Sequence, residues 1–374
     1  RVCAQRVASG IQVPQHDNSS MDGYVVRSQD VVAGKSLSVS QRIAAGDSPE
    51  PLQPGTAARI FTGAPIPQGA DSVIMQEMAE TTQEGVVSFQ EPPKPGQWVR
   101  RAGEDLQIGQ TVIEQGQVLS AFDVGLLASI GLPTVTVSRR LKVGLLITGS
   151  ELQVPGKPLA PGQIYNSNQF VWQGLLQQLG VDVVCAGIVK DSLPATVAEM
   201  EKLAQCDVVL SSGGVSVGEE DHVKAAVQQV GTLQSWKVSM KPGKPMAFGQ
   251  IKGQGEHSAW FFGLPGNPVS SSVTFLLVVK PFIRLLQGQS VEQVDWRGYA
   301  QHLHMASDWL KPDRRRQEFL RAEQKGGKLH LFANQSSGVL TSMSQSTGLV
   351  QVQVEQALKV GDLAVYYSYQ DLMR

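Results

Sequence analysis

Cysteine is scarce in this sequence, and its spacing excludes a disulfide framework. The 374 residues include three cysteines, Cys3, Cys185 and Cys206, which lie far apart and form no Cys-x-x-Cys pair. Disulfide-stapled domains need an even set of cysteines, and zinc ribbons need closely paired ones. The pattern therefore indicates a reducing compartment, and we expect a cytoplasmic protein.

Long apolar runs and an excess of either charge are also missing. The longest apolar candidate, residues 273–279, is far shorter than the ~20 residues that span a bilayer, and the start of the chain has no signal-peptide pattern. The net charge of −1 gives no field that would recruit nucleic acid. We therefore expect neither a membrane nor a nucleic-acid partner. Because the first residue is Arg1, we also expect a preceding segment.

Local patterns divide the chain into three stretches. Up to about residue 140, short β-prone runs alternate with turns, apart from one helix predicted over residues 120–130. Over residues 141–288, apolar strands (142–148, 181–189 and 207–211) alternate with helices (167–179, 192–204 and about 221–230), and a long helix follows over 267–286. This alternation predicts an α/β domain with a mostly parallel sheet covered on both faces. After residue 288 a small β domain is predicted.

Two glycine-containing loops follow strands of the α/β domain and could bind an anion. The first contains Ser211, Gly213 and Gly214 between a strand and a helix, where ligands of open α/β sheets bind. Glycines let backbone N–H groups turn towards a ligand, and the helix N-terminus adds partial positive charge. The second loop, residues 263–268, places Asn267 and Pro268 at the start of the long helix. The alternatives are a plain turn and a well-capped helix, and neither loop has Walker A or dinucleotide-binding spacing.

Acidic residues follow successive strands of the same domain. Glu151 follows the first strand, Asp191 the second, and Glu219, Glu220 and Asp221 the third. The carboxyl ends of parallel strands meet at one sheet edge, so these side chains should converge, and with phosphate oxygens they could hold Mg²⁺. Each carboxylate taken alone is more typical of a helix cap or a solvated surface position.

Lysines are expected to complete this edge. If residues 236–240 are extended, alternation places Lys237 and Lys241 on one face, close to Lys244, where ammonium groups would bind phosphate or a doubly charged oxyanion. The alternative is a solvated strand face, the usual place of lysine. In the N-terminal part, residues 17–24, 60–67 and 101–105 are predicted to be loops with a polar purpose.

Together these segments resemble the molybdopterin molybdenumtransferase family (MoeA type), which includes the gephyrin and plant Cnx E domains. The matching segments are residues 17–24, 61–65, 103–105, 148–152, 211–218 with Asp221, 241–245 and 263–269. Their order and approximate spacing run through more than two thirds of the chain, which makes the set specific although no single segment is decisive.

The resemblance implies a four-domain protomer in a homodimer. The implied domains are an elongated N-terminal domain (1–27 and 101–138), an inserted β-rich domain (28–100), the α/β molybdopterin-binding domain (139–288) and a C-terminal β domain (289–374). The implied reaction, assisted by Mg²⁺, inserts molybdate into adenylated molybdopterin and yields molybdenum cofactor and AMP at a site shared between subunits. Molybdopterin adenylyltransferase and molybdoenzymes are the implied partners.

The resemblance also assigns roles to single residues. Catalytic roles fall to Asp22, Thr62, Asp105, Glu151, Asp191 and Asp221, of which Glu151, Asp191 and Asp221 would bind the metal. Substrate or anion binding falls to Ser211, Gly213, Gly214, Ser216, Gly218, Lys237, Lys241, Lys244, Pro265, Pro268, Arg316 and Ser337. Ser150 stands where many relatives carry aspartate, which removes one possible metal ligand.

Three alternative functions stay open at this point. A molybdopterin adenylyltransferase would use the same α/β fold but would not need the flanking domains. A scaffold could bind a peptide through the C-terminal β domain, as gephyrin relatives anchor receptors through this module. A pterin- or nucleotide-binding protein without turnover is the third alternative, and the acidic and basic edge speaks against it.

Overall fold

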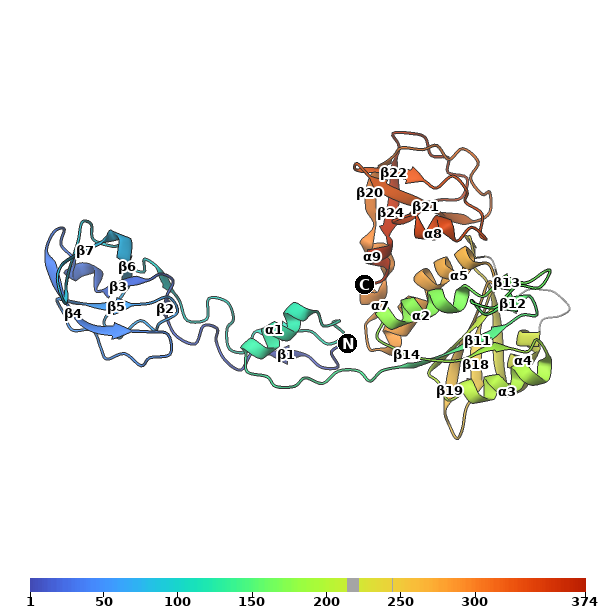
Figure 1. Cartoon of the computed structure of the whole chain (residues 1–374), viewed down its shortest axis with the longest axis horizontal. Helices are drawn as coiled ribbons and strands as arrows, with labels where there is room; N and C mark the ends of the chain where they lie inside the picture. Colours follow the sequence, from blue (N-terminus) through green and yellow to red (C-terminus); the bar gives the residue numbers. More distant parts are fainter. Residues whose placement is uncertain (214–221, 244) are drawn as a thin grey trace. The chain divides into compact units, whose positions relative to one another are not determined.

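The computed structural model describes residues 1–213, 222–243 and 245–374, without the side chains of residues 235–237 and 245. The chain forms two compact units, one of Cys3–Val137 and one of Ser138–Arg374 together with Arg1–Val2 (Figure 1). The first unit covers the two predicted N-terminal domains, and the second covers the predicted α/β and C-terminal domains. The predicted boundaries at residues 27, 100 and 288 lie inside these units and stay predictions.

A six-stranded sheet forms the centre of the larger unit, as predicted. Its order is β14 (Asp182–Val189), β11 (Lys142–Thr148), β15 (Val208–Ser212), β19 (Ser258–Leu264), β18 (Pro245–Lys252) and β16 (Gly231–Lys237). The first four strands are parallel, and β18 and β16 are antiparallel to their neighbours. The parallel strands therefore end at one edge of the sheet, which is where a ligand of an α/β domain binds.

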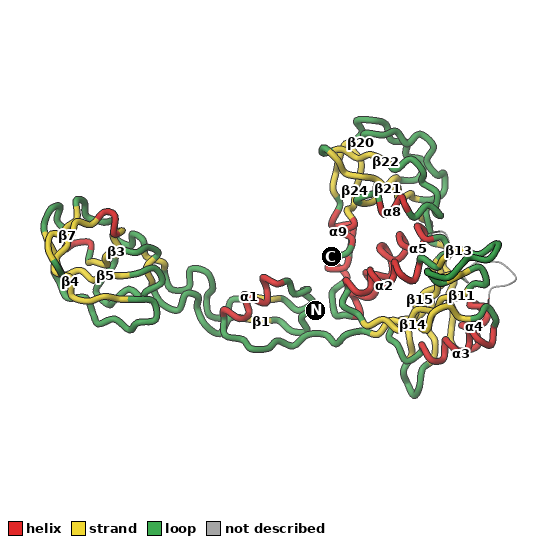
Figure 2. The backbone as a smooth tube through the Cα atoms, in the orientation of Figure 1, coloured by secondary structure: helices red, strands yellow, loops and turns green. Residues whose placement is uncertain are grey.

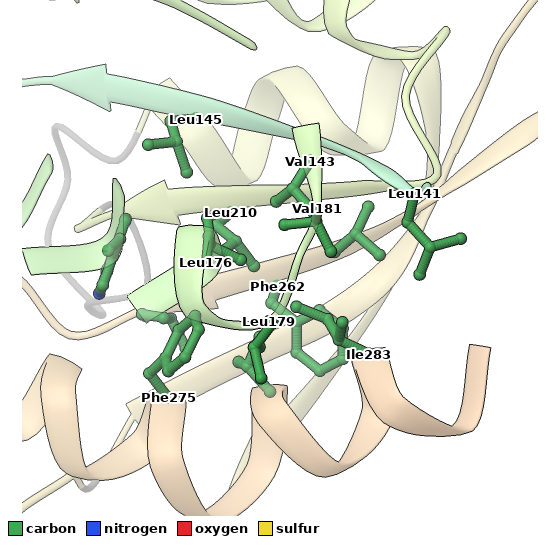
Figure 3. Close-up of a cluster of buried hydrophobic side chains, with 14 of the residues drawn as sticks. Leu141, Val143, Leu145, Leu176, Leu179, Val181, Leu210, Phe262, Phe275 and Ile283 are labelled. Carbon is green, nitrogen blue, oxygen red and sulfur yellow. The ribbon is translucent and has the colours of Figure 1, made fainter. Parts of the chain in front are cut away.

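Helices cover both faces of this sheet because its central strands are apolar on both sides. Leu145 packs with α2 (Asn168–Gln178) and the long helix, whereas the next residue, Leu146, packs with α3 (Leu193–Leu203) and α4 (His222–Val230). Figure 3 shows the first of these clusters, in which Phe275 and Ile283 of the long helix lie below the strand residues. Such two-sided burial is expected of parallel strands.

The long helix runs over Pro268–Leu286 but is not uniform. Its parts are α5 (Pro268–Thr274), a π-helical turn (Phe275–Val279) and α6 (Lys280–Leu286). Pro281 has no N–H to donate to the preceding turn. The indole Nε1 of Trp296 donates instead to the carbonyl of Leu277, at 3.0 Å. Asn267 and Pro268 take the predicted cap and first-turn positions, although the Asn267 side chain makes no capping bond.

This helix corrects the expectation that no segment approaches the length of a membrane span. Its 19 residues reach a mean hydropathy of 1.6, which is long and apolar enough by length and composition, and 72% of the apolar window is buried. One side packs on the sheet, and the other side, through Val273 and Leu277, packs on the C-terminal domain. A helix that is hydrophobic all round is typical of such a core position.

The C-terminal domain is a small β-barrel. Its closed ring consists of β21 (Gln317–Lys325), β22 (Lys328–Leu331), β20 (Gln301–Met305), β24 (Leu363–Ser368) and β23 (Gly348–Val352), which pairs back with β21. The short strand β17 (Met240–Lys241), which precedes this domain in the sequence, pairs in parallel with the start of β21. Leu320, Val350 and Tyr366 are among the side chains that fill the interior.

The path of residues 236–241 differs from the prediction. β16 ends at Lys237, and Met240–Lys241 belong to the other sheet, paired with Gln317 and Glu318. Lys237 and Lys241 therefore do not share one face of one strand. The reason is tertiary packing, since Met240 is buried in the core between the long helix and the barrel.

The smaller unit is mostly β, as predicted (Figure 2). Its main sheet has the order β6 (Ser72–Met75), β3 (Gly23–Val26), β5 (Thr56–Ile60), β4 (Ser36–Ile43), β8 (Val86–Phe89) and β7 (Ala79–Gln83). Two short pairs accompany it: β1 (Val7–Ala8) with β10 (Thr111–Ile113), and β2 (Asn18–Ser19) with β9 (Val99–Arg100). The predicted helix is α1 (Ala121–Ser129), with Ser120 and Asp123 in a capping box.

Candidate functional site

A cavity of about 760 Å³ lies at the carboxyl edge of the central sheet, where two of the predicted carboxylates meet. Glu151 and Asp191 both line this space, which we call the acidic cavity. Among the described residues, the other lining residues come from five segments of the domain and from the barrel: Thr148, Gly149, Leu152, Ile164, Tyr165, Asn166, Ser167, Asn168, Ser212, Gly213, His222, Val223, Gly266, Asn267, Pro268, Gly338 and Leu340.

A hydrogen bond from the end of β11 orients one of these carboxylates, Asp191. The hydroxyl of Thr148 donates to Oδ1 of Asp191 at 3.3 Å, which ties the ends of β11 and β14 together. Gly149 has a φ of +149°, and a Cβ at this position would lie 2.6 Å from Oε2 of Glu151. The positive φ favours glycine at this turn, and the missing Cβ leaves room for the Glu151 carboxylate.

The chemistry of these groups suits a hard cation. Mg²⁺ prefers oxygen ligands, and it commonly takes one or two carboxylates together with substrate phosphates and waters. Glu151 and Asp191 supply two carboxylates in one cavity, and Thr148 adds a hydroxyl. Within the described residues no three acidic, histidine or cysteine side chains form a metal cluster, and Asp221, the third predicted ligand, lies outside those residues.

The first glycine loop differs from its prediction at two positions. The Ser211 hydroxyl donates to the Gly213 carbonyl at 3.2 Å, and the side chain is fully buried rather than part of the cavity wall. The Gly213 amide donates to the carbonyl of Leu264 at 2.9 Å, so it is not available to an anion. The serine that lines the cavity is Ser212, because successive side chains of a strand point to opposite faces.

The remaining predicted residues near this edge fall into three groups. Pro268 lines the acidic cavity, whereas Pro265 is buried and does not. Lys237 ends β16, but its side chain is not described. Four further predicted residues lie outside the described part of the chain: Gly214, Ser216, Gly218 and Lys244.

A second cavity, of about 570 Å³, contains Lys241 and lies against the barrel; we call it the arginine cavity. It is lined by Lys241, Pro242, Trp309, Glu318, Leu320, Arg321, Ala333, Asn334, Gln335 and Ser336. The prediction that Lys241 shares an edge with the acidic residues is therefore wrong, because β17 carries this lysine to the barrel.

Buried Glu318 fixes the position of Lys241. The Lys241 ammonium lies 2.9 Å from Oε1 of Glu318 and 3.8 Å from Oδ2 of Asp313. Oε2 of Glu318 accepts hydrogen bonds from Nε1 of Trp309 (2.9 Å) and from the Asp313 amide (2.8 Å). Oε2 thus has two hydrogen-bond donors, whereas Oε1 has the ion pair with Lys241 but no hydrogen-bond donor among the described residues. The lysine itself stays at the cavity surface, 42% exposed.

Arg321 is the basic group that the sequence reasoning missed. It is 1% exposed, and its guanidinium donates to the Ser342 hydroxyl (3.1 Å) and to the carbonyls of Phe319 and Ser336 (both 3.3 Å). No carboxylate pairs with it in the part of the chain that the structure describes, and burial lowers its pKa to about 10. A buried cation held only by neutral groups retains its charge for an anionic ligand.

Arg316, which was predicted to bind substrate, has a different role in the structure. It pairs with Asp313 at 2.9 Å and does not line either cavity. The signal for Arg321 was its position in the short apolar part of β21, between Leu320 and Ala322, where a side chain is expected to be buried.

One segment of the barrel separates the two cavities. Asn334, Gln335 and Ser336 line the arginine cavity, while Gly338 and Leu340 line the acidic one. Ser337 lies between them, and its carbonyl accepts a hydrogen bond from the Val269 amide at 3.0 Å. The start of the long helix is therefore attached to the wall that both cavities share.

The smaller unit contains the three other predicted catalytic residues. Oδ1 of Asp22 accepts hydrogen bonds from the amide (2.8 Å) and hydroxyl (2.7 Å) of Thr62. These bonds, with a smaller contribution from the charge of Arg59, hold the pKa of Asp22 below its usual value. Asp105 is exposed in a turn, where its amide donates to the carbonyl of Val13 at 3.0 Å. Asp22 is thus an exposed carboxylate that is hydrogen-bonded to exposed Thr62.

Comparison with known proteins assigns most of each unit to regions of one protein family. Residues 1–131 match the MoeA N-terminal region (domain I and II), residues 144–285 a probable molybdopterin binding domain, and residues 305–369 the MoeA C-terminal region (domain IV). A molybdopterin molybdenumtransferase of Haemophilus influenzae is 48% identical over 77% of this chain and 71% of its own length. One from Nostoc is 37% identical over 93% of this chain and 81% of its own. The chain belongs to the molybdopterin molybdenumtransferase family.

Solved structures of this family share the fold. A MoeA protein from Pyrococcus horikoshii matches 99% of this chain and 92% of its own with a TM-score of 0.81 at 27% identity. Gephyrin from Dictyostelium discoideum is 32% identical over 78% of this chain, which corresponds to 46% of that protein. The matches to the N-terminal and C-terminal regions distinguish the chain from an adenylyltransferase built of the α/β domain alone.

Proposed function

We propose that this chain inserts molybdate into adenylated molybdopterin and releases AMP. The observation that carries the proposal is the pair of cavities in the larger unit, one acidic and one containing a buried arginine, with residues 334–340 between them. An adenylated pterin dithiolate has a phosphoanhydride at one end and two sulfur ligands at the other. One substrate could therefore extend from the first cavity to the second.

The acidic cavity supports the release of AMP. Water attacks the phosphorus of the adenylyl group, the P–O bond to the bridging oxygen breaks, and AMP leaves with the oxygen of the water. The bridging oxygen stays on the pterin phosphate, and the protons of the water pass to the phosphate products or to solvent. Mg²⁺ bound to Glu151 and Asp191 would supply charge neutralisation for the phosphate groups. Thr148 keeps Asp191 oriented through its hydrogen bond to Oδ1.

The arginine cavity supports molybdate binding. Arg321 and Lys241 present two cations to a doubly charged oxyanion, and the arginine is fixed before the ligand arrives. Insertion then forms two Mo–S bonds, and two oxide groups leave as water with protons from the thiols and solvent. Holding both reactants side by side makes this step effectively intramolecular.

We further propose a cytoplasmic homodimer in which the second subunit supplies Asp22, Thr62 and Asp105 to the site. The support is that Asp22 and Thr62 are pre-arranged yet exposed in their own unit. Helix α1 in the same unit exposes two apolar side chains, Phe122 at 89% and Val124 at 58%.

The experiment that tests the two-cavity assignment measures AMP release and molybdenum incorporation separately in two variants. Asp191→Asn should lower the rate of AMP release by about a hundredfold. This is the usual effect on rate when one group that stabilises charge in a transition state is lost. Lys241→Gln should instead raise the molybdate concentration for half-maximal incorporation by about tenfold or more. Lys252→Gln, at an exposed lysine, is the control and should change neither.

The reverse pattern would exclude the assignment. If Lys241→Gln lowered AMP release at saturating molybdate, or Asp191→Asn changed only molybdate dependence, the two cavities would not have these roles. Binding of the adenylated pterin without any AMP release by the unmodified chain would favour a binding protein without turnover.

A further inference from the structure

Asn168 connects the two loops that border the acidic cavity. It is the first residue of α2 and is 8% exposed. Its Nδ2 donates to the hydroxyl oxygen of Ser212 at 2.8 Å and to the carbonyl of Gly266 at 2.7 Å. Ser212 ends β15, before the first glycine loop, and Gly266 belongs to the loop that precedes the long helix. One buried side chain therefore holds both loops.

The orientation of the Asn168 amide follows from its partners. The carbonyl of Gly266 can only accept a hydrogen bond, so the nitrogen, not the oxygen, of the amide must face it. The same nitrogen then supplies the second proton to Ser212. Because an amide nitrogen has two donor protons, Asn168 satisfies both neighbours at once.

This arrangement determines what the Ser212 hydroxyl can do. The oxygen already accepts a proton from Asn168, so its own O–H is left to donate. Among the described residues that O–H has no acceptor, although the side chain is 7% exposed and lines the acidic cavity. A buried donor without a partner costs free energy unless a ligand or water accepts its proton.

We infer that Ser212 donates a hydrogen bond to a phosphate oxygen of the adenylated substrate, and that Asn168 is the positioning residue that makes Ser212 a donor. This inference rests on the proposed function. It replaces Ser211, whose hydroxyl is bonded to Gly213, as the serine of this strand that contacts the ligand. Phosphate is the matching ligand because it accepts strong hydrogen bonds and would lie beside Glu151 and Asp191 with a cation.

Three variants test the inference: Ser212→Ala, Asn168→Asp and the double variant. Ser212→Ala removes the donor. Asn168→Asp makes a carboxylate that accepts the Ser212 proton and cannot donate to Gly266. Each single variant should weaken the binding of AMP in the presence of Mg²⁺ by about tenfold to a hundredfold, as measured by calorimetry. Each should also raise KM for the adenylated pterin by a similar factor. The double variant should bind AMP no more weakly than Asn168→Asp alone, because both changes remove the same hydrogen bond.

The control is Ser290→Ala, which also deletes a hydroxyl that accepts an N–H proton, here from Gln293 at the start of α7 (Val291–Val294). It should leave AMP binding unchanged. Ser212→Ala keeps the inference testable even if Asn168→Asp does not fold. If the unmodified chain releases AMP but Ser212→Ala binds AMP with wild-type affinity, the inference is overturned and the proposed function is not. The same holds if Ser212→Ala changes only the dependence on molybdate. A wild-type chain that neither binds nor releases AMP would instead overturn the proposed function.

Discussion

Lys280 is a buried cation whose removal should stabilise the larger unit. It lies at the start of α6, 1% exposed, where the long helix is packed between the sheet and the barrel. Burial lowers its pKa from 10.5 to about 8, and the charge of Arg284, one turn further along, acts in the same direction. We therefore predict that Lys280→Met raises the free energy of unfolding at neutral pH.

The expected gain follows from the size and sign of this shift. A change in pKa from 10.5 to about 8 corresponds to about 3 kcal/mol, at about 1.4 kcal/mol per unit. Between these two values the unfolded chain binds more protons than the folded chain, so the stability of the wild type rises with pH in that window. The advantage of Lys280→Met should be full below pH 8 and should fade as the pH approaches 10.5.

Urea unfolding followed by tryptophan fluorescence measures this difference. Five of the six tryptophans lie in the larger unit, since Trp98 alone belongs to Cys3–Val137, so the signal reports mainly the unit that contains Lys280. Lys252→Met, at an exposed lysine, is the matched control and should give no comparable gain. An unchanged midpoint for Lys280→Met at pH 7, or the same gain at pH 7 and pH 10.5, would refute the reasoning.

Two further predictions concern the site. Arg321→Gln should raise the molybdate concentration for half-maximal incorporation by about tenfold or more. Arg316→Gln should have a smaller effect, because of these two arginines only Arg321 lines the arginine cavity. Equal effects of the two variants in the incorporation assay would count against molybdate binding in that cavity. Co-assembled Asp22→Asn and Asp191→Asn chains should recover about a quarter of wild-type AMP release if the site is shared between subunits, because half of the dimers are mixed and each has one intact site. No recovery in the AMP assay of the mixture would place the site within one chain.

Much of the fold could be predicted from the sequence because local and tertiary preferences agree there. β11 and α3 follow directly from apolar runs and helical periodicity, and the predicted helix in the smaller unit has the expected Ser120 cap. Glu151 and Asp191 could be placed at one edge because parallel strands end together, whatever their distance in the sequence.

The rest of the site depends on contacts that no local pattern reveals. Lys241 leaves the central sheet because Met240 is buried against the barrel, a long-range effect. Asn168 lies in the first turn of the helix predicted over residues 167–179, where a polar residue is ordinary, and its bonds to Ser212 and Gly266 join positions 44 and 98 residues away. For Arg321 the sequence indicates burial but not the partners, since Ser336 and Ser342 lie 15 and 21 residues further along the chain.

The most direct test of the central claim is AMP release from adenylated molybdopterin by the unmodified chain, with Mg²⁺ present and molybdate either included or omitted. We predict release that depends on molybdate and is accompanied by active molybdenum cofactor. Failure to release AMP with the pterin still bound would contradict the account and would leave the two cavities as binding sites without turnover.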